Sequence, residues 1–142
     1  MNYKAILFYL GLYIFPLTGL AFLNILYSTY FDYFLSIDSY TVTFFLALVT
    51  GSFFCYYGKN SLKKINFYEQ LLLIILVYLM SSIFIALPYY LSNYQITFFD
   101  SVFESFSGIT STGFSIFENI KYLDPTLILW RSSSQWIGGL YF

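Results

Sequence analysis

The chain has 142 residues, of which 59% are hydrophobic, 25% aromatic and only 9% charged, whereas an ordinary soluble domain is about 25% charged. Six basic and seven acidic residues give a net charge of −1, which offers no electrostatic support for a nucleic-acid partner. Histidine is absent and the single cysteine, Cys55, lies in an apolar stretch. The sequence therefore lacks a disulfide framework, a thiol metal site and the commonest general base.

Three apolar stretches have the length that crosses a bilayer, which is about 20 residues. They cover residues 5–28, 41–57 and 67–90. The first follows Lys4 and could instead be a signal peptide, but its apolar part exceeds the roughly 7–15 residues of such peptides and no small-residue cleavage site follows. We therefore predict that it is retained as a transmembrane helix.

The basic residues predict the orientation of these helices. Lys4 precedes the first stretch, and the lysine-rich run at residues 59–64 lies between the second and the third. Alternating topology puts both on one side of the membrane, which the positive-inside rule assigns to the cytoplasm. The N-terminus is then cytoplasmic, and the loop that carries Asp32 and Asp38 faces outward.

A polar stretch, residues 98–115 (FFDSVFESFSGITSTGFS), separates the third apolar stretch from a fourth that starts near Thr126. Its first part has the period of one helical face, with Phe99, Val102, Phe103 and Phe106. The helical pattern stops at Gly108, and a short hydroxyl-rich segment follows. A half-length helix that ends in such a segment, between two membrane spans, is typical of a pore helix and its selectivity filter.

Backbone carbonyls of a filter replace the hydration shell of a cation, so this segment should be extended and shielded from lipid. Gly113 can adopt backbone conformations closed to other residues, and Thr110, Ser111 and Thr112 bring hydroxyls to a wet path. The preceding helix would direct its partly negative C-terminal end at the ion. Taken alone, however, Thr-Ser-Thr-Gly is also compatible with a simple turn after a helix.

Two charged positions have alternative interpretations. Glu104 and Asp100 are one helical turn apart and could form a catalytic carboxylate pair, but nothing else completes a catalytic set, and Glu104 is better explained as support for the filter. Arg131 would lie inside a membrane helix, where a charge is usually paired or functional, or it could snorkel to the outer surface.

The order and spacing of several short motifs resemble the first pore-forming repeat of the Trk/Ktr/HKT superfamily of potassium transporters, and within it the bacterial Trk membrane subunit. The matching motifs are ALP at 86–88, FESFSG at 103–108, TSTG at 110–113, WR at 130–131 and QWIGG at 135–139. The segments before Leu71 resemble the two additional N-terminal helices of the Trk branch.

Residues and resemblance together predict an all-α integral membrane fold, with two N-terminal transmembrane helices followed by one helix–pore-helix–helix repeat of a potassium-channel-like fold whose last helix is truncated. The expected divisions are two accessory helices in residues 1–66 and a pore repeat in 67–142, made of an outer helix at 67–90, a pore helix at 98–109, a filter at 110–115 and the start of an inner helix at 126–142.

The resemblance implies potassium uptake across the bacterial inner membrane, by the N-terminal part of a longer transporter. The filter would be Thr110, Ser111, Thr112, Gly113 and Phe114, with potassium on the backbone carbonyls and with support from Glu104, Gly108 and Arg131. It also implies the remaining pore repeats, a second copy of the protein and a cytosolic nucleotide-binding regulatory subunit as partners, besides membrane lipid.

No cofactor is expected beyond the transported ion. The alternative function is that of a truncated, non-conducting membrane protein with a structural or interaction role. A membrane enzyme is disfavoured by the missing histidine and by the lack of a nucleophile and base.

Overall fold

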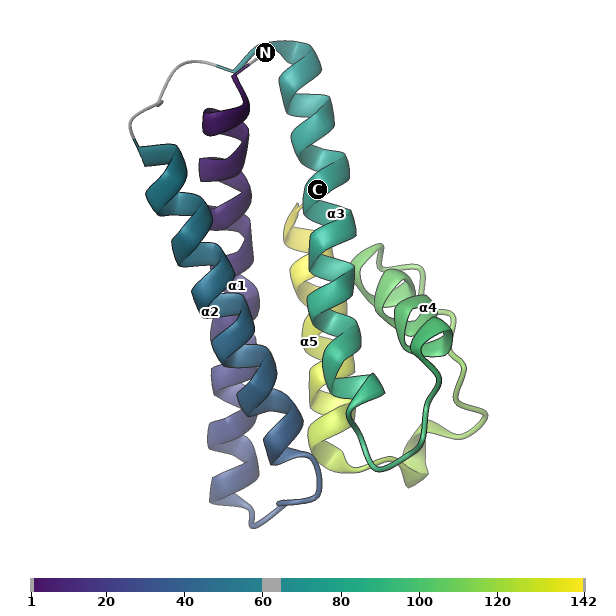
Figure 1. The fold of residues 1–142 in the computed structure, drawn as a ribbon. Helices are drawn as coiled ribbons and strands as arrows, with labels where there is room; N and C mark the ends of the chain where they lie inside the picture. Colours follow the sequence, from purple (N-terminus) through teal and green to yellow (C-terminus); the bar gives the residue numbers. More distant parts are fainter. Residues whose placement is uncertain (1, 60–64, 142) are drawn as a thin grey trace.

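The computed structural model describes residues 2–59 and 65–141, and these parts of the chain are helical and contain no strand. The elements are α1 (Tyr3–Tyr30), α2 (Ile37–Gly58), α3 (Phe67–Tyr90), α4 (Phe98–Ile109), the short 3-10 helix η2 (Ile120–Tyr122) and α5 (Pro125–Tyr141). Figure 1 shows α1, α2, α3 and α5 as roughly aligned rods, with α4 set beside α3 and α5. The predicted all-helical class is confirmed.

Helices α1, α2 and α3 contain 28, 22 and 24 residues, and by length and hydropathy each could cross a membrane. Together they indicate a multi-pass membrane protein. α1 and α2 extend beyond the apolar stretches that predicted them. The Asn2 side chain accepts from the Ala5 N–H at 3.3 Å, and the Ser36 carbonyl accepts from the Ser39 N–H at 3.1 Å. The Asn2 side chain therefore caps α1 at a start that hydropathy does not reveal, whereas Ser36 at the start of α2 forms no side-chain cap.

Two glycines allow α1 and α2 to pack closely as an antiparallel hairpin. A Cβ on Gly11 would lie 2.7 Å from the Gly51 carbonyl oxygen and 2.8 Å from Cys55 Sγ. The Cys55 thiol donates to the Phe8 carbonyl at 3.7 Å. Small residues that let helix backbones approach are the usual device of helix packing in membranes, and the cysteine serves here as a small packing group.

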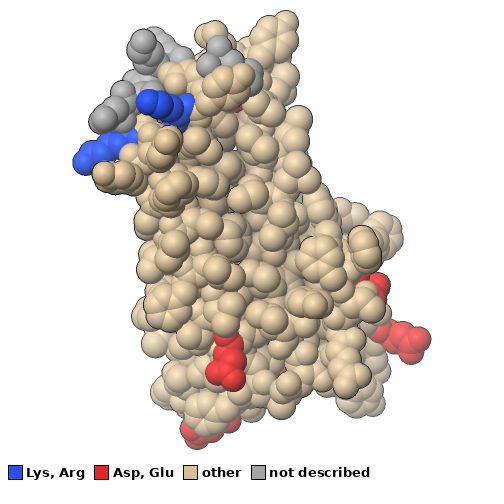
Figure 2. All heavy atoms as spheres, in the orientation of Figure 1, with Lys and Arg blue, Asp and Glu red and all other residues tan. Residues whose placement is uncertain are grey.

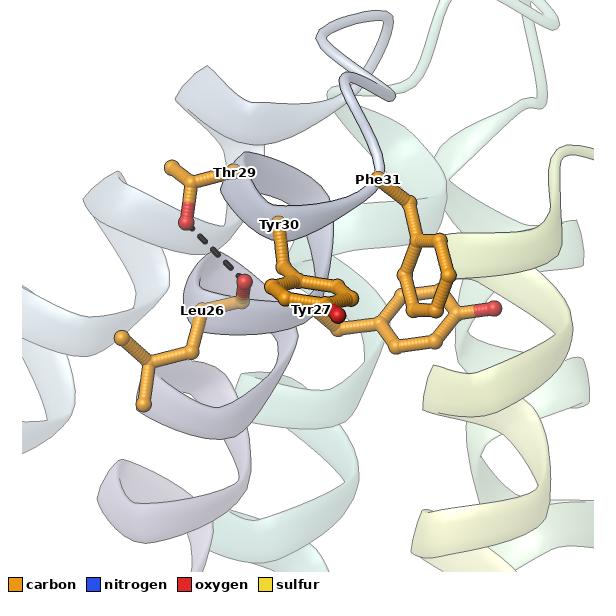
Figure 3. A pocket seen from close by; sticks show the side chains of 5 residues that line it. All are labelled: Leu26, Tyr27, Thr29, Tyr30 and Phe31. Carbon is orange, nitrogen blue, oxygen red and sulfur yellow. Dashed lines mark hydrogen bonds between the residues drawn. The ribbon is translucent and has the colours of Figure 1, made fainter.

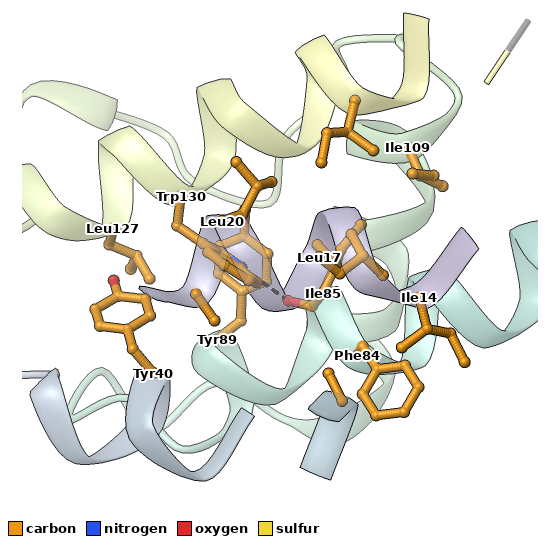
Figure 4. Close-up of a cluster of buried hydrophobic side chains, with 13 residues drawn as sticks. Ile14, Leu17, Leu20, Tyr40, Phe84, Ile85, Tyr89, Ile109, Leu127 and Trp130 are labelled. Carbon is orange, nitrogen blue, oxygen red and sulfur yellow. Dashed lines mark hydrogen bonds between the residues drawn. The ribbon is translucent and has the colours of Figure 1, made fainter. Parts of the chain in front are cut away.

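One hydrophobic cluster joins all five α-helices (Figure 4). Trp130 of α5 is fully buried in it, and its indole N–H donates to the Ile85 carbonyl of α3 at 3.0 Å. The Tyr40 hydroxyl of α2 donates to Oγ1 of Thr126, which also belongs to α5, at 3.2 Å. The first half of α5 is therefore fixed to both α2 and α3, across the two parts into which we divided the chain.

Basic and acidic side chains lie at opposite ends of the α1–α2 hairpin. Lys4 and Lys59 lie at the end where α1 begins and α2 ends, and Figure 2 shows blue side chains at this end. Asp32 and Asp38 lie at the opposite end, around the turn between the helices. Of the lysine-rich run at 59–64, residues 60–64 fall outside the described part of the chain. The orientation in the membrane stays a prediction.

Candidate functional site

Helix α4 contains 12 residues, so it is about 18 Å long and cannot cross a hydrocarbon core of about 30 Å. Its start is fixed by Thr97, whose hydroxyl oxygen accepts from the Asp100 N–H at 3.2 Å. The same hydroxyl donates to the Asp100 carboxylate at 2.6 Å. Asp100 thus serves the N-terminal cap of α4 on the exposed side of the helix.

The side of α4 that faces the rest of the chain is polar and small. Ser101 and Ser105 are fully buried and Glu104 is 1% exposed, whereas Phe99 is 83% and Phe103 51% exposed. The apolar face predicted from the helical period therefore points away from the described parts of the chain. Glu104 and Asp100 also diverge, and the structure does not bring them together as a catalytic carboxylate pair.

The chain leaves α4 through a Schellman-type cap. The Ser111 N–H donates to the Gly108 carbonyl at 2.9 Å and the Thr112 N–H to the Ser107 carbonyl at 3.0 Å, while Ser111 has a left-handed φ of 53°. These bonds satisfy carbonyls that a helix end leaves unpaired. The expectation of a fully extended segment is therefore wrong for Thr110 and Ser111, which form the turn that the sequence also allowed.

A second positive φ follows at Gly113, at 84°. A Cβ there would meet nothing within 4 Å, so backbone conformation rather than space favours glycine. One residue later, the Ser107 hydroxyl donates to the Phe114 carbonyl at 2.6 Å. The segment thus folds back along the end of α4 and is held there by a side chain of α4.

A buried ion pair holds the residues that come next. Glu104 pairs with the Arg131 guanidinium of α5, and the side chains are 1% and 13% exposed. The same carboxylate accepts from the Ile116 N–H at 2.9 Å and from the Ser115 hydroxyl at 3.2 Å. Of the two interpretations of Arg131, the paired one is observed. Ser107 and Ser115 were not singled out from the sequence, since exposed serines give the same pattern.

The oxygen atoms of residues 110–114 differ in whether other groups of the chain already lie within hydrogen-bond distance of them. Arg131 Nη2 lies 3.5 Å from the carbonyl oxygens of both Gly113 and Phe114. Thr110 Oγ1 and Thr112 Oγ1 are 2.6 Å apart. The carbonyls of residues 110–112 accept no hydrogen bond from the described parts of the chain. These exposed carbonyls and hydroxyls are the oxygens available to a cation.

Close contact with α5 fixes the end of α4 from the other side. A Cβ on Gly108 would lie 2.7 Å from Ser134 Oγ, and one on Gly138 would overlap the Ile109 carbonyl. The Ser111 hydroxyl also donates to the Gln135 carbonyl at 3.0 Å. The end of α4 and the QWIGG motif of residues 135–139 therefore meet at this contact.

The other described features have a different chemistry from this segment. The described residues contain no group of three or more His, Cys, Asp or Glu side chains that could hold a metal ion. A hollow of about 540 Å³ at the end of α1 is lined by Leu26, Tyr27, Thr29, Tyr30 and Phe31 (Figure 3). These aromatic rings suit the headgroup level of a membrane.

No protein-family model matches the sequence. It is 33% identical over 103 residues to an uncharacterized cation transporter of Methanocaldococcus jannaschii, which is 69% of this chain and 22% of that protein. To the Trk system potassium uptake protein TrkH of Escherichia coli it is 31% identical over 103 residues, covering 72% of this chain and 21% of the other.

A third relative is the Trk system potassium uptake protein TrkI of Halomonas elongata, 38% identical over 73 residues, which covers 51% of this chain and 15% of that protein. The chain spans about a fifth of the length of the first two relatives. All three names describe transport proteins rather than enzymes. The chain is therefore related to the Trk system potassium uptake proteins, as its motifs predicted.

Proposed function

We propose that this chain is the N-terminal part of a Trk-type potassium uptake protein and that residues 110–114 form one quarter of its selectivity filter. One observation carries the proposal. A half-length helix ends in exposed, unengaged carbonyls, braced by a buried ion pair, in a chain similar to potassium uptake proteins. Several oxygens must replace the hydration shell of the ion together, so one such segment supplies only part of a ring.

Each part of the site has a role in this proposal. The carbonyls of Thr110, Ser111 and Thr112 face the ion, and the turn at Gly113 fixes their orientation. The C-terminal end of α4 adds a partial negative charge, which favours a cation. Glu104 and Arg131 act as a brace, because the carboxylate holds residues 115–116 and the guanidinium lies against the carbonyls that follow the filter.

The finer layout belongs to the same proposal. In it, α3 is the outer helix, α4 the pore helix and α5 the start of the inner helix, while α1 and α2 are accessory. The protein lies in the bacterial inner membrane with its N-terminus in the cytoplasm. The remaining repeats, a second copy and a cytosolic nucleotide-binding subunit complete the transporter.

A non-conducting structural role is the second candidate, and one observation favours it. The Phe114 carbonyl is taken by the Ser107 hydroxyl, and both it and the Gly113 carbonyl lie near Arg131. These two carbonyls are directed at the protein rather than at open space. A segment that serves only to end α4 would have this arrangement as well.

The variant Gly113→Ser separates the two candidates in the intact transporter. A filter with serine at a positive φ should lose part of its preference for potassium over sodium, while the amount of protein in the membrane stays near normal. Gly19→Ser is the matched control, because Gly19 lies in α1 with no neighbour within 4 Å of a Cβ.

The measurement is uptake with competing ions in cells that lack other potassium systems, corrected for the amount of protein in the membrane. Unchanged ion preference in a well-produced Gly113→Ser protein would remove the filter proposal. The isolated chain of 142 residues should not restore growth at low potassium, because it provides about a quarter of a ring.

A further inference from the structure

A basic hollow lies at one end of the α1–α2 hairpin, far from the segment after α4. It has a volume of about 410 Å³ and is lined by Lys4, Tyr56, Tyr57 and Lys59. Lys4 belongs to the first turn of α1, Tyr56 and Tyr57 lie in the last turn of α2, and Lys59 directly follows α2. Tyr56 is 81% and Tyr57 59% exposed. Figure 2 shows blue side chains at the surface of this end of the molecule.

The charges of the two lysines are not neutralised by any neighbour among residues 2–59 and 65–141. Neither Lys4 nor Lys59 forms an ion pair with any residue that the structure describes. Glu69 lies in the first turn of α3 at the same end, but the residue is only 6% exposed and its carboxylate accepts the backbone N–H groups of Asn2 at 2.5 Å and Asn66 at 2.8 Å. The start of α1 and the end of α2 carry opposite partial charges, which offset each other. Among the described residues at this end, the two ammonium groups therefore carry unpaired positive charge.

Helix packing brings the two lysines together. A Cβ on Gly58 would lie 2.5 Å from the Lys4 carbonyl oxygen and 2.5 Å from Phe8 Cβ. The first turn of α1 can approach the end of α2 only because Gly58 has no side chain. The neighbouring positions of Lys4 and Lys59 are thus built into the contact between the helices and do not depend on side-chain flexibility alone.

We propose that this hollow binds the phosphate headgroup of an anionic phospholipid. The hairpin has the length of two membrane-crossing helices, so its ends lie at headgroup depth. Basic pockets at that depth attract anionic headgroups, and lysine stems can extend along apolar surface while their ammonium groups reach phosphate. Tyrosine rings are also favoured at this level of the membrane.

The surroundings of the hollow favour a lipid over a free anion from solution. The ring of Phe53 lies one helical turn from Tyr57 with ring centroids 5.7 Å apart, and Phe53 is 57% exposed. Apolar surface therefore continues from the hollow along α2 toward the middle of the membrane. An acyl chain attached to a bound headgroup would lie along this surface, whereas inorganic phosphate would make no use of it.

Binding to the purified chain in neutral detergent tests the proposal. Native mass spectrometry would follow titrations with phosphatidylglycerol and with phosphatidylcholine, and competition by inorganic phosphate. Phosphatidylglycerol should bind more tightly. Lys59→Gln should weaken its binding about five-fold, and the double variant Lys4→Gln/Lys59→Gln about 25-fold, since a basic residue near an anionic surface contributes about a factor of five. Binding of phosphatidylcholine should not change.

Lys121→Gln is the matched control, because Lys121 is an exposed lysine in η2 and does not line the hollow. Helix content from circular dichroism should be equal in all variants. Equal losses in Lys121→Gln and Lys59→Gln would overturn the proposal, since they would indicate a general effect of net charge. Equal affinity for the two lipids would also overturn it, as would displacement of phosphatidylglycerol by inorganic phosphate at equal concentration.

Discussion

Replacing Glu104 by glutamine would test whether the buried ion pair holds the segment after α4. The carboxylate pairs with Arg131, accepts the Ile116 N–H at 2.9 Å and accepts the Ser115 hydroxyl at 3.2 Å. Glutamine keeps the shape but leaves the guanidinium without its counter-charge. Removing one partner of a buried pair costs about 3–5 kcal/mol. Because the Arg131 side chain is 13% exposed, we expect a loss near the lower limit, about 3 kcal/mol.

The free energy of unfolding in detergent, followed by the fluorescence of Trp130 and Trp136, measures this loss. Asp100→Asn is the matched control on the same helix, because Asp100 is exposed and asparagine keeps an oxygen that can accept from the Thr97 hydroxyl; it should cost no more than about 1 kcal/mol, the contribution of an acidic residue at a helix N-terminus. Combining Glu104→Gln with Arg131→Gln gives a double-mutant cycle. A coupling energy below about 0.5 kcal/mol would refute the reasoning, because residues in direct contact couple by about 0.5–3 kcal/mol.

Two further predictions concern packing and topology. Gly138→Ala should cost about 1–3 kcal/mol of unfolding free energy, because its Cβ would overlap the Ile109 carbonyl. The control Gly139→Ala should be neutral or stabilising, because among the described residues its Cβ would have only the Ser111 hydroxyl within 4 Å, at 3.9 Å. Equal losses of unfolding free energy in the two variants would contradict the close α4–α5 contact. Cysteines at Asp38 and Lys59, in an otherwise cysteine-free protein, should react with an impermeant maleimide from opposite sides of the membrane, and labelling of both from one side would exclude the predicted topology.

The long helices could be predicted from the sequence, because the length and hydropathy of a segment can be read from that segment alone. The apolar stretch at residues 67–90 coincides with α3, and the helix predicted at 98–109 coincides with α4. Whether they form a pore repeat stays a prediction. The hairpin contact at Gly11 and Gly51 could not be located in advance, because a glycine in an apolar stretch gives no sign of the residue that it faces.

The sequence singled out some residues of the candidate site but not the contacts between them. Glu104 and Arg131 were identified separately, and their pairing depends on how α4 and α5 pack. The turn at Ser111 was misjudged for a physical reason. Left-handed residues at helix ends are usually glycine, so the turn was expected at a glycine, Gly108 or Gly113. Instead, Ser111 occupies the left-handed position that directly follows the α4 cap.

The arrangement of α4 explains why its polar face had to be buried. Burying Phe99 and Phe103 against α5 would place Glu104 on the outer side, where a charge in contact with lipid is costly. The observed choice leaves these two rings exposed, at a cost of about 1.5–3 kcal/mol each in water but at little cost in lipid or against neighbouring protein. It also lets Gly138 touch the backbone at Ile109. α4 is therefore built for apolar surroundings, with its charge and hydroxyls turned toward the segment that they hold.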